Sequence, residues 1–205
     1  SGLLEKRKDV IKSGQNKGIL WVGLSRPRYF HWMISAPQAP NMKQYLLDQI
    51  TFFGKLNPAT RKQITLRTFH TDYGLDIKSI LQGQYPDLTF CSSQQDMNHD
   101  LRKNQLCVIS YNGTPLLEAM ASDYPVLGFW DPSHWELRDS AKPFFDMMVE
   151  TGILFYDAAE AAEKLNQIFY GPRLWWNDEQ VVKARKYFCN QFALTGRRWQ
   201  MSWND

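Results

Sequence analysis

The chain has 205 residues, of which 43% are hydrophobic and 14% aromatic, so it can bury one sizeable core, and its length favours one domain over two. The net charge of +3 is mild and the basic residues are spread out, so we predict no nucleic-acid partner. No run of about 18 apolar residues occurs and the start lacks a signal-peptide pattern, so we predict no transmembrane segment.

Short apolar runs alternate with helical patterns along most of the chain. Residues 18–24 are apolar and predict a buried strand, and similar runs predict strands at 64–69, 88–91, 106–110, 125–130 and 153–156. Helices are predicted at 3–13, 41–55, 76–83, 94–103, 115–122, 139–151, from 157 onward, and at 179–193. Such alternation predicts an α/β fold, a Rossmann-like doubly wound parallel sheet of six strands with helices on both faces.

The organisation of the chain follows from these elements. We divide it into a linker or N-terminal helix at 1–17, the Rossmann-like domain at 18–193 and a Trp-containing tail at 194–205. Residues 25–40 contain prolines and no period, which predicts a long loop. Tryptophans outside the strand pattern indicate either a docking surface or peripheral core packing; they are Trp175, Trp176, Trp199 and Trp203.

The cysteines and acidic residues favour no metal site. Cys91, Cys107 and Cys189 are far apart and match no zinc spacing, so we predict that they are packed in the interior of a protein from a reducing, cytoplasmic compartment. Asp72 and Asp76 have no matching third ligand, and we interpret them as turn and cap residues.

The segment after the fourth strand carries the sharpest functional signal. Ligands of doubly wound sheets bind beyond the carboxyl ends of the strands, where the strand order reverses. Asn112 and Gly113 follow the strand, Gly113 permits a tight turn, and Thr114 can cap a helix that has Pro115 in its first position. The free N–H groups and dipole of that helix favour a phosphate. Glu118, one turn later, can accept hydrogen bonds from ribose hydroxyls.

Glu118 has a second interpretation, as a capping-box partner or a solvated helix residue. A capping box anchored on Thr114 would place its carboxylate at position 117, where the sequence has Leu117. We therefore favour the binding role.

Three sequence blocks resemble known families. Gly113-Thr114, then Glu118-Ala119, then Pro125-Val126-Leu127 resemble the donor-binding motif in the C-terminal domain of glycosyltransferases with the GT-B fold. The blocks at 18–30 and 129–141 resemble O-antigen and capsule transferases known as surface-carbohydrate biosynthesis proteins. The second of these blocks, which contains His-Trp-Glu-Leu-Arg-Asp, is the more specific, and the blocks together cover residues 18–190.

The resemblance implies one half of a two-domain enzyme. The substrate would be a nucleotide-activated sugar of the UDP or CMP type, and no bound metal or other cofactor is expected. An N-terminal half, which we expect in the full-length protein, would bind a glycan or lipid-linked acceptor and supply the catalytic base. The protein would act in the cytoplasm, with peripheral association at the inner face of the membrane. We expect this chain alone to bind nucleotide weakly and to transfer no sugar.

Residues in the loops after the first and second strands are the catalytic candidates. Ser25 is a binding candidate, and Arg26 and Arg28 flank a proline in a loop that can hold a diphosphate or stabilise charge on the leaving nucleotide. His70 stands three residues after Arg67 and can donate to a phosphate or neutralise it. Related transferases carry a His-Pro pair there, and the pair is broken here because Thr71 follows.

The loop after the fifth strand supplies further binding candidates. His134, Glu136 and Arg138 can reach a sugar, or the glutamate and arginine can form an internal ion pair that shapes the loop. Two other enzymes fit the same scaffold, a nucleotide-sugar epimerase and a CDP-alcohol phosphotransferase. An alternative of another class is a non-catalytic module that docks a partner through the Trp-containing tail.

Overall fold

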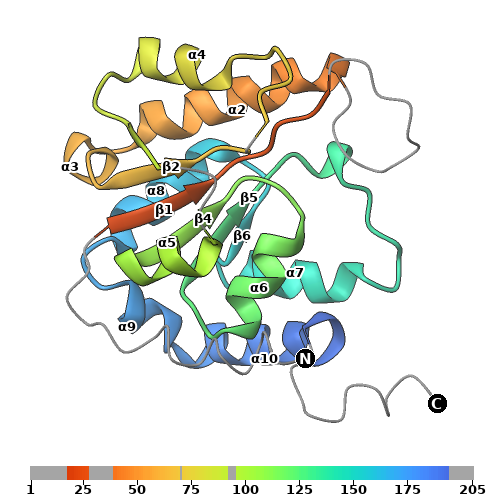
Figure 1. The fold of residues 1–205 in the computed structure, drawn as a ribbon. Coiled ribbons are helices and arrows are strands. Elements are labelled where there is room, and N and C mark those ends of the chain that lie inside the picture. The colour runs from red at the N-terminus through yellow and green to blue at the C-terminus, as the bar shows by residue number, and fades with distance from the viewer. Residues whose placement is uncertain (1–17, 28–38, 70, 92–95, 194–205) are drawn as a thin grey trace.

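The structure is a computed structural model that describes residues 18–27, 39–69, 71–91 and 96–193. Its centre is a six-stranded sheet with the order β3-β2-β1-β4-β5-β6 (Figure 1). Every neighbouring pair of strands is parallel, which confirms the predicted doubly wound fold. The order runs outward from the centre in both directions, so the topological switch point lies between β1 and β4.

All six predicted strands are present. They are β1 (Gly18–Val22), β2 (Ile64–Arg67), β3 (Thr89–Phe90), β4 (Asn104–Ile109), β5 (Val126–Phe129) and β6 (Leu154–Phe155). All six end earlier than predicted, and β4 begins two residues earlier. The central strands β1, β4 and β5 are almost wholly buried, as expected for parallel strands that are covered by helices on both faces.

The helices predicted within the described ranges are also present. They are α2 (Met42–Lys55), α4 (Ile77–Gln84), α5 (Met97–Lys103), α6 (Thr114–Ala121), α7 (Lys142–Glu150), α8 (Ala158–Ile168) and α10 (Glu179–Phe192). The sequence did not predict the short elements η2 (Ala39–Asn41), α3 (Pro58–Arg61), η3 (Pro132–His134) and α9 (Pro172–Trp176). The helix predicted at 3–13 lies outside the described residues.

Two layers of helices cover the sheet (Figure 1). On one face α2 packs against α4 and α8, and on the other α10 packs against α6 and α7. Aromatic rings join α2 to the sheet, because Phe52 stacks on Phe129 with 4.5 Å between ring centroids and Phe53 packs against Trp21 at 5.6 Å. The core is therefore continuous behind the carboxyl ends of the central strands.

The structure decides between docking and packing for some of the four tryptophans. Trp176 is fully buried and donates from Nε1 to Asp123 Oδ1 at 3.0 Å, so for this residue peripheral core packing is confirmed. Arg185 forms an ion pair with the same carboxylate and lies over the Trp176 ring, 4.5 Å from its centroid. Trp175 packs against the core, while Trp199 and Trp203 lie outside the described residues.

The three cysteines are free thiols. Cys107 is fully buried in β4, which confirms its predicted packing role. Cys91 and Cys189 are only partly buried, so the prediction holds for them in part. Cys91 lies at the carboxyl edge of the sheet, next to a pocket that is described below.

Candidate functional site

A buried hydroxyl network ties the two strands of the switch point together. The backbone N–H of Leu24, just past β1, donates to Tyr45 Oη at 2.7 Å. Ser110, just past β4, lies 2.7 Å from the same oxygen and donates to Val22 O at 3.1 Å. Because the serine hydrogen is used on Val22, the Tyr45 hydroxyl donates to Ser110. Burial raises the pKa of Tyr45, so the hydroxyl stays protonated and the network stays intact.

The turn after β4 opens directly into α6, as predicted, but its details differ. Gly113 is the N-cap residue and Thr114 is the first helical residue, so the predictions of a Thr114 cap and of Pro115 in first position are wrong. No side-chain hydrogen bond caps the helix, because the Thr114 hydroxyl lies inside the helix rather than ahead of it. Pro115 has no N–H and Leu116 N–H donates to Gly113 O, so the helix start offers an anion few backbone donors.

Gly113 is required for a reason other than the predicted one. Its backbone is extended, with φ of −166°, which any residue can adopt. A Cβ at this position would lie 2.5 Å from Cε2 of the Tyr111 ring, which is too close. The missing side chain therefore makes room for Tyr111 at the edge of the site.

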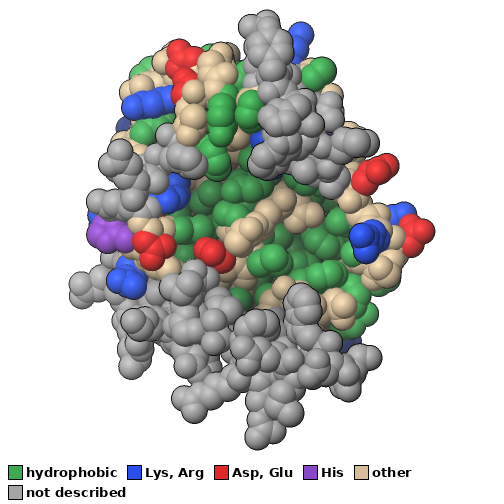
Figure 2. Space-filling model, turned by 45° about the vertical axis from the view of Figure 1, so that its right-hand side comes forward, with side chains coloured by type: hydrophobic (Ala, Val, Ile, Leu, Met, Phe, Trp, Pro, Cys, Tyr) green, Lys and Arg blue, Asp and Glu red, His purple; other side chains and the backbone are tan. Residues whose placement is uncertain are grey.

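A pocket of about 240 Å³, here called the switch-point pocket, lies between the ends of β1 and β2 and the start of α6. It is lined by Val22, Gly23, Arg67, Thr68, Phe69, Met97, Tyr111, Thr114, Pro115 and Glu118. The structure thus brings two predicted binding residues, Thr114 and Glu118, to one cavity at the switch point. Figure 2 shows this side of the molecule as a hollow with many hydrophobic side chains and with charged side chains at its rim.

Three charged side chains act electrostatically on Tyr111, which lines this pocket. Burial raises the pKa of Tyr111 to about 12, the positive charges of Arg26 and Arg67 act to lower it, and the negative charge of Glu118 acts to raise it. Such effects weaken with distance. Two cations and one carboxylate therefore act on the same tyrosine. Arg67 and Glu118 line the pocket with it, and Arg26 is one of the residues that the sequence predicted.

Arg67, the last residue of β2, forms a buried ion pair with Asp100 of α5. Nη1 of Arg67 lies 2.5 Å from Oδ2 of Asp100, and the two side chains are only 16% and 5% exposed. The Cys91 thiol donates to the same carboxylate oxygen at 3.6 Å. Burial and the negative charge of Asp100 raise the pKa of Cys91 to about 11, so the thiol stays protonated at neutral pH.

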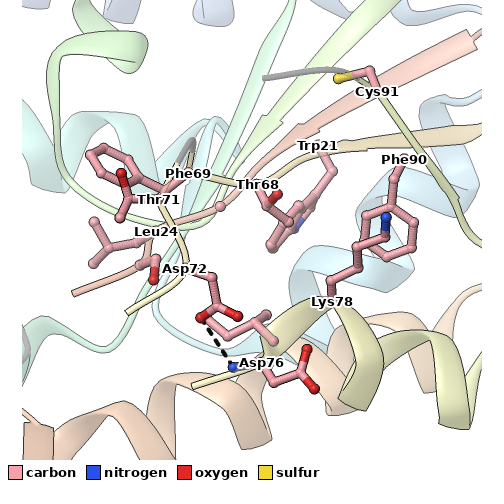
Figure 3. A pocket seen from close by; sticks show the side chains of 13 residues that line it. Trp21, Leu24, Thr68, Phe69, Thr71, Asp72, Asp76, Lys78, Phe90 and Cys91 are labelled. Carbon is pink, nitrogen blue, oxygen red and sulfur yellow. Dashed lines mark hydrogen bonds between the residues drawn. The ribbon is translucent and has the colours of Figure 1, made fainter. Parts of the chain in front are cut away.

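A second pocket of about 430 Å³, here called the edge pocket, adjoins the ends of β1, β2 and β3 (Figure 3). It is lined by Trp21, Gly23, Leu24, Ser25, Thr68, Phe69, Thr71, Asp72, Asp76, Ile77, Lys78, Phe90 and Cys91. Asp72 Oδ1 accepts the backbone N–H groups of residues 74, 75 and 76, and Asp76 Oδ1 accepts Ser79 N–H at the start of α4. These bonds confirm that Asp72 and Asp76 are turn and cap residues.

The remaining candidates are distributed differently. Arg28 and His70 lie outside the described residues, Ser25 lines the edge pocket, and Asn112 is partly buried in the turn before α6. In the loop after β5, His134 is partly buried against Trp135, and Glu136 and Arg138 are exposed. The ion pair found in that loop joins Asp139 to Lys142. The binding roles of these residues stay predictions.

Two residues that shape the site were not found from the sequence. Tyr45 lies on α2 and Asp100 on α5, and neither belongs to a recognisable motif. Asp100 is an acidic residue in a polar helix, which is ordinarily solvated, yet it is 4% exposed here. Only the order of the strands brings these side chains to the switch point.

The sheet defines a Rossmann-like α/β protein, and charged side chains line a pocket at its switch point. Residues 2–205 match the LIC12162 family transferases, and the chain belongs to this family. The prediction of a transferase is thereby confirmed at the level of the enzyme class. No curated protein matches the chain.

The described part of the chain has neither a candidate metal site nor a candidate membrane span. There, no three or more His, Cys, Asp or Glu side chains are grouped so that they could hold a metal ion. Nor does any helix in those ranges have both the length and the apolar character needed to cross a membrane.

Proposed function

We propose that the protein is the nucleotide-sugar-binding domain of a glycosyltransferase that builds bacterial surface polysaccharide such as O-antigen or capsule. The observation that carries this proposal is the switch-point pocket. Its wall combines the start of α6 at Thr114 with Glu118 and with the cation Arg67, and the charge of Arg26 acts on the same wall. A nucleotide has the complementary chemistry, because it carries anionic phosphate next to a ribose with two hydroxyls.

Each group of the donor has a proposed partner. The start of α6 and Arg26 contact the phosphate, and Glu118 accepts hydrogen bonds from the ribose hydroxyls. Transfer breaks the bond between the anomeric carbon and the phosphate oxygen and forms a bond to the acceptor oxygen, whose proton goes to a base. Cations near the leaving phosphate accelerate this step, because the negative charge there grows in the transition state.

The remaining parts of the proposal come from the family resemblance. The loop with His134, Glu136 and Arg138 faces the sugar, and Arg28 and His70 assist at the phosphate. The acceptor, a glycan or a lipid-linked glycan, is bound by a second domain that also supplies the base. The enzyme works in the cytoplasm, at the inner face of the membrane.

Nucleotide binding by Glu118 variants tests the core of this proposal. The protein is titrated calorimetrically with UDP, CDP, CMP, GDP and ADP, and the best ligand is compared with its 2′-deoxy form. Glu118→Gln should lower the affinity for the ribonucleotide about ten-fold or more, because a charge-assisted hydrogen bond contributes roughly 1.5–3 kcal/mol. It should weaken binding of the 2′-deoxy form less, because that form offers Glu118 only the 3′-hydroxyl.

The matched control is Glu163→Gln, which makes the same change at an exposed position of α8, outside the pockets described above. This control should bind like the wild type. If Glu118→Gln and Glu163→Gln bind the ribonucleotide equally well, the assignment of Glu118 to the ribose is wrong. If the wild type binds no nucleotide at all, the proposed donor class is wrong.

A further inference from the structure

Arg67 occupies an unusual position for a charged side chain. It pairs with Val22 in the register of β1 and β2, at the point where both strands end. Along β2 the fully buried Ile64 and Leu66 alternate with the partly buried Thr65 and Arg67. Arg67 therefore lies on the less buried face of the strand and brings a positive charge to the wall of the switch-point pocket.

Stability alone does not explain the ion pair that Arg67 makes. Removing two charges from water costs several kcal/mol per ion in general, and well-packed hydrophobic residues often replace such pairs without loss. The neighbouring strand ends at Val22 and Ile109 are apolar, so an apolar pair would suit this environment. The buried Asp100 instead keeps a cation beside the pocket.

The contact with Asp100 also fixes the direction of the guanidinium group. Its five N–H groups form a rigid planar fork, which matches the oxygens of a phosphate when the plane is correctly oriented. Asp100 accepts a hydrogen bond from Nη1 of the fork, and the Cys91 thiol donates to the same carboxylate oxygen. A cation that is fixed before binding loses less conformational entropy when an anion arrives.

As described above, the start of α6 offers few backbone N–H groups to an anion in this pocket. Arg67 lines the same pocket as Thr114, and its charge acts on Tyr111 together with that of Arg26. We propose that Arg67 binds the phosphate group of the ligand directly and that Asp100 is a positioning residue that fixes Arg67. The inference rests on the proposed function, because it takes the ligand to be a nucleoside phosphate.

Binding of anions by charge-neutral variants tests the inference. The probes are pyrophosphate, UDP and CDP, titrated into the wild type, Arg67→Gln, Asp100→Asn and the double variant, after circular dichroism has shown that each is folded. Arg67→Gln should lower the affinity for pyrophosphate and for both nucleotides at least about ten-fold. Arg67→Lys, which keeps the charge but not the fork, should recover only part of this loss and serves if Arg67→Gln does not fold.

Asp100→Asn separates positioning from simple electrostatics. Removal of a negative charge near an anion site should by itself strengthen anion binding. Positioning predicts the opposite, a loss of roughly three- to ten-fold, and no further loss in the Arg67→Gln background, because the two residues act through one contact. A purely structural pair would lower the melting temperature and leave the affinities unchanged.

Arg61→Gln is the matched control. Arg61 forms a comparable ion pair with Asp87, at 3.0 Å and with side chains 19% and 22% exposed, but it lines neither the switch-point pocket nor the edge pocket. Arg61→Gln should change the stability of the protein and leave its affinities for pyrophosphate, UDP and CDP unchanged.

The outcomes separate this inference from the proposed function. If UDP or CDP binds equally well to the wild type and to Arg67→Gln, the inference is overturned while the donor class stands. If pyrophosphate binds in an Arg67-dependent way and none of UDP, CDP, CMP, GDP and ADP binds more tightly, the anion role stands and the donor class falls. Equal or tighter binding by Asp100→Asn overturns the positioning role. A wild type that binds none of the probes overturns the role of Arg67, and it overturns the proposed function as well if CMP, GDP and ADP also fail to bind.

Discussion

Replacing Tyr45 with Phe removes the hydroxyl that joins the ends of β1 and β4. The change leaves the Leu24 N–H without its partner, in a region where Leu24 is 5% and Tyr45 2% exposed. A buried donor without a partner costs about 1–3 kcal/mol. Ser110 keeps its bond to Val22 O, and the ring volume is unchanged, so no second orphan donor and no cavity add to the cost. We expect a loss of about 1–3 kcal/mol in the free energy of unfolding.

Urea unfolding measures this loss, with Tyr170→Phe as the control because Tyr170 is 84% exposed. The midpoint should fall in Tyr45→Phe with an unchanged slope, and the control should match the wild type. The affinity for nucleotide should also fall, because Leu24 leads directly to Ser25 and Arg26. A stability change below about 0.5 kcal/mol, which is typical of surface substitutions, would refute the importance of the network.

Two further predictions concern pH and the turn before α6. Burial raises the pKa of Tyr45, Tyr111 and Tyr124 above the ordinary value of 10.0, so the folded state holds these protons more tightly than the unfolded state. The thiols of Cys91 and Cys107, whose pKa is raised above the ordinary 9.0, act in the same direction. Stability should therefore fall as the pH rises past about 9 and more steeply past about 10, where the tyrosines add their effect, and this second fall should be less steep in Tyr45→Phe. Urea midpoints that stayed level up to about pH 11 would contradict this. Gly113→Ala should displace the Tyr111 ring, cost about 1–3 kcal/mol and weaken nucleotide binding. The control is Gly83→Ala, where a Cβ meets nothing within 4 Å. In urea unfolding it should be neutral or stabilising, and its affinity for nucleotide should match that of the wild type.

The fold could be predicted because its strands carry their signal locally. β1 and β4 are buried on both faces, so each appears in the sequence as one continuous apolar run. The long helix α2 shows its period clearly over 14 residues. The helices α3 and α9 have four and five residues, which is too few for a helical period to be visible.

The site was predictable only where it is local in sequence. The turn at Gly113 and the carboxylate at Glu118 lie five residues apart, and both were found. Tyr45 and Ser110 are 65 residues apart and Arg67 and Asp100 are 33 apart, so only the strand order brings each pair together. The position of the helix start was missed because caps depend on backbone angles that the residues Thr114 and Pro115 do not fix.

The segment of Thr68 and Phe69 also matters for the design of ligands. These two residues and Gly23 line both the edge pocket and the switch-point pocket. A fragment that contacts these residues in the larger cavity of about 430 Å³ therefore already lies against the wall of the switch-point pocket. If the proposed function holds, chemical growth past Phe69 would turn a weak, uncharged fragment into a compound that competes with the phosphate of the proposed donor. An inhibitor of this protein could thus be built without carrying a phosphate of its own.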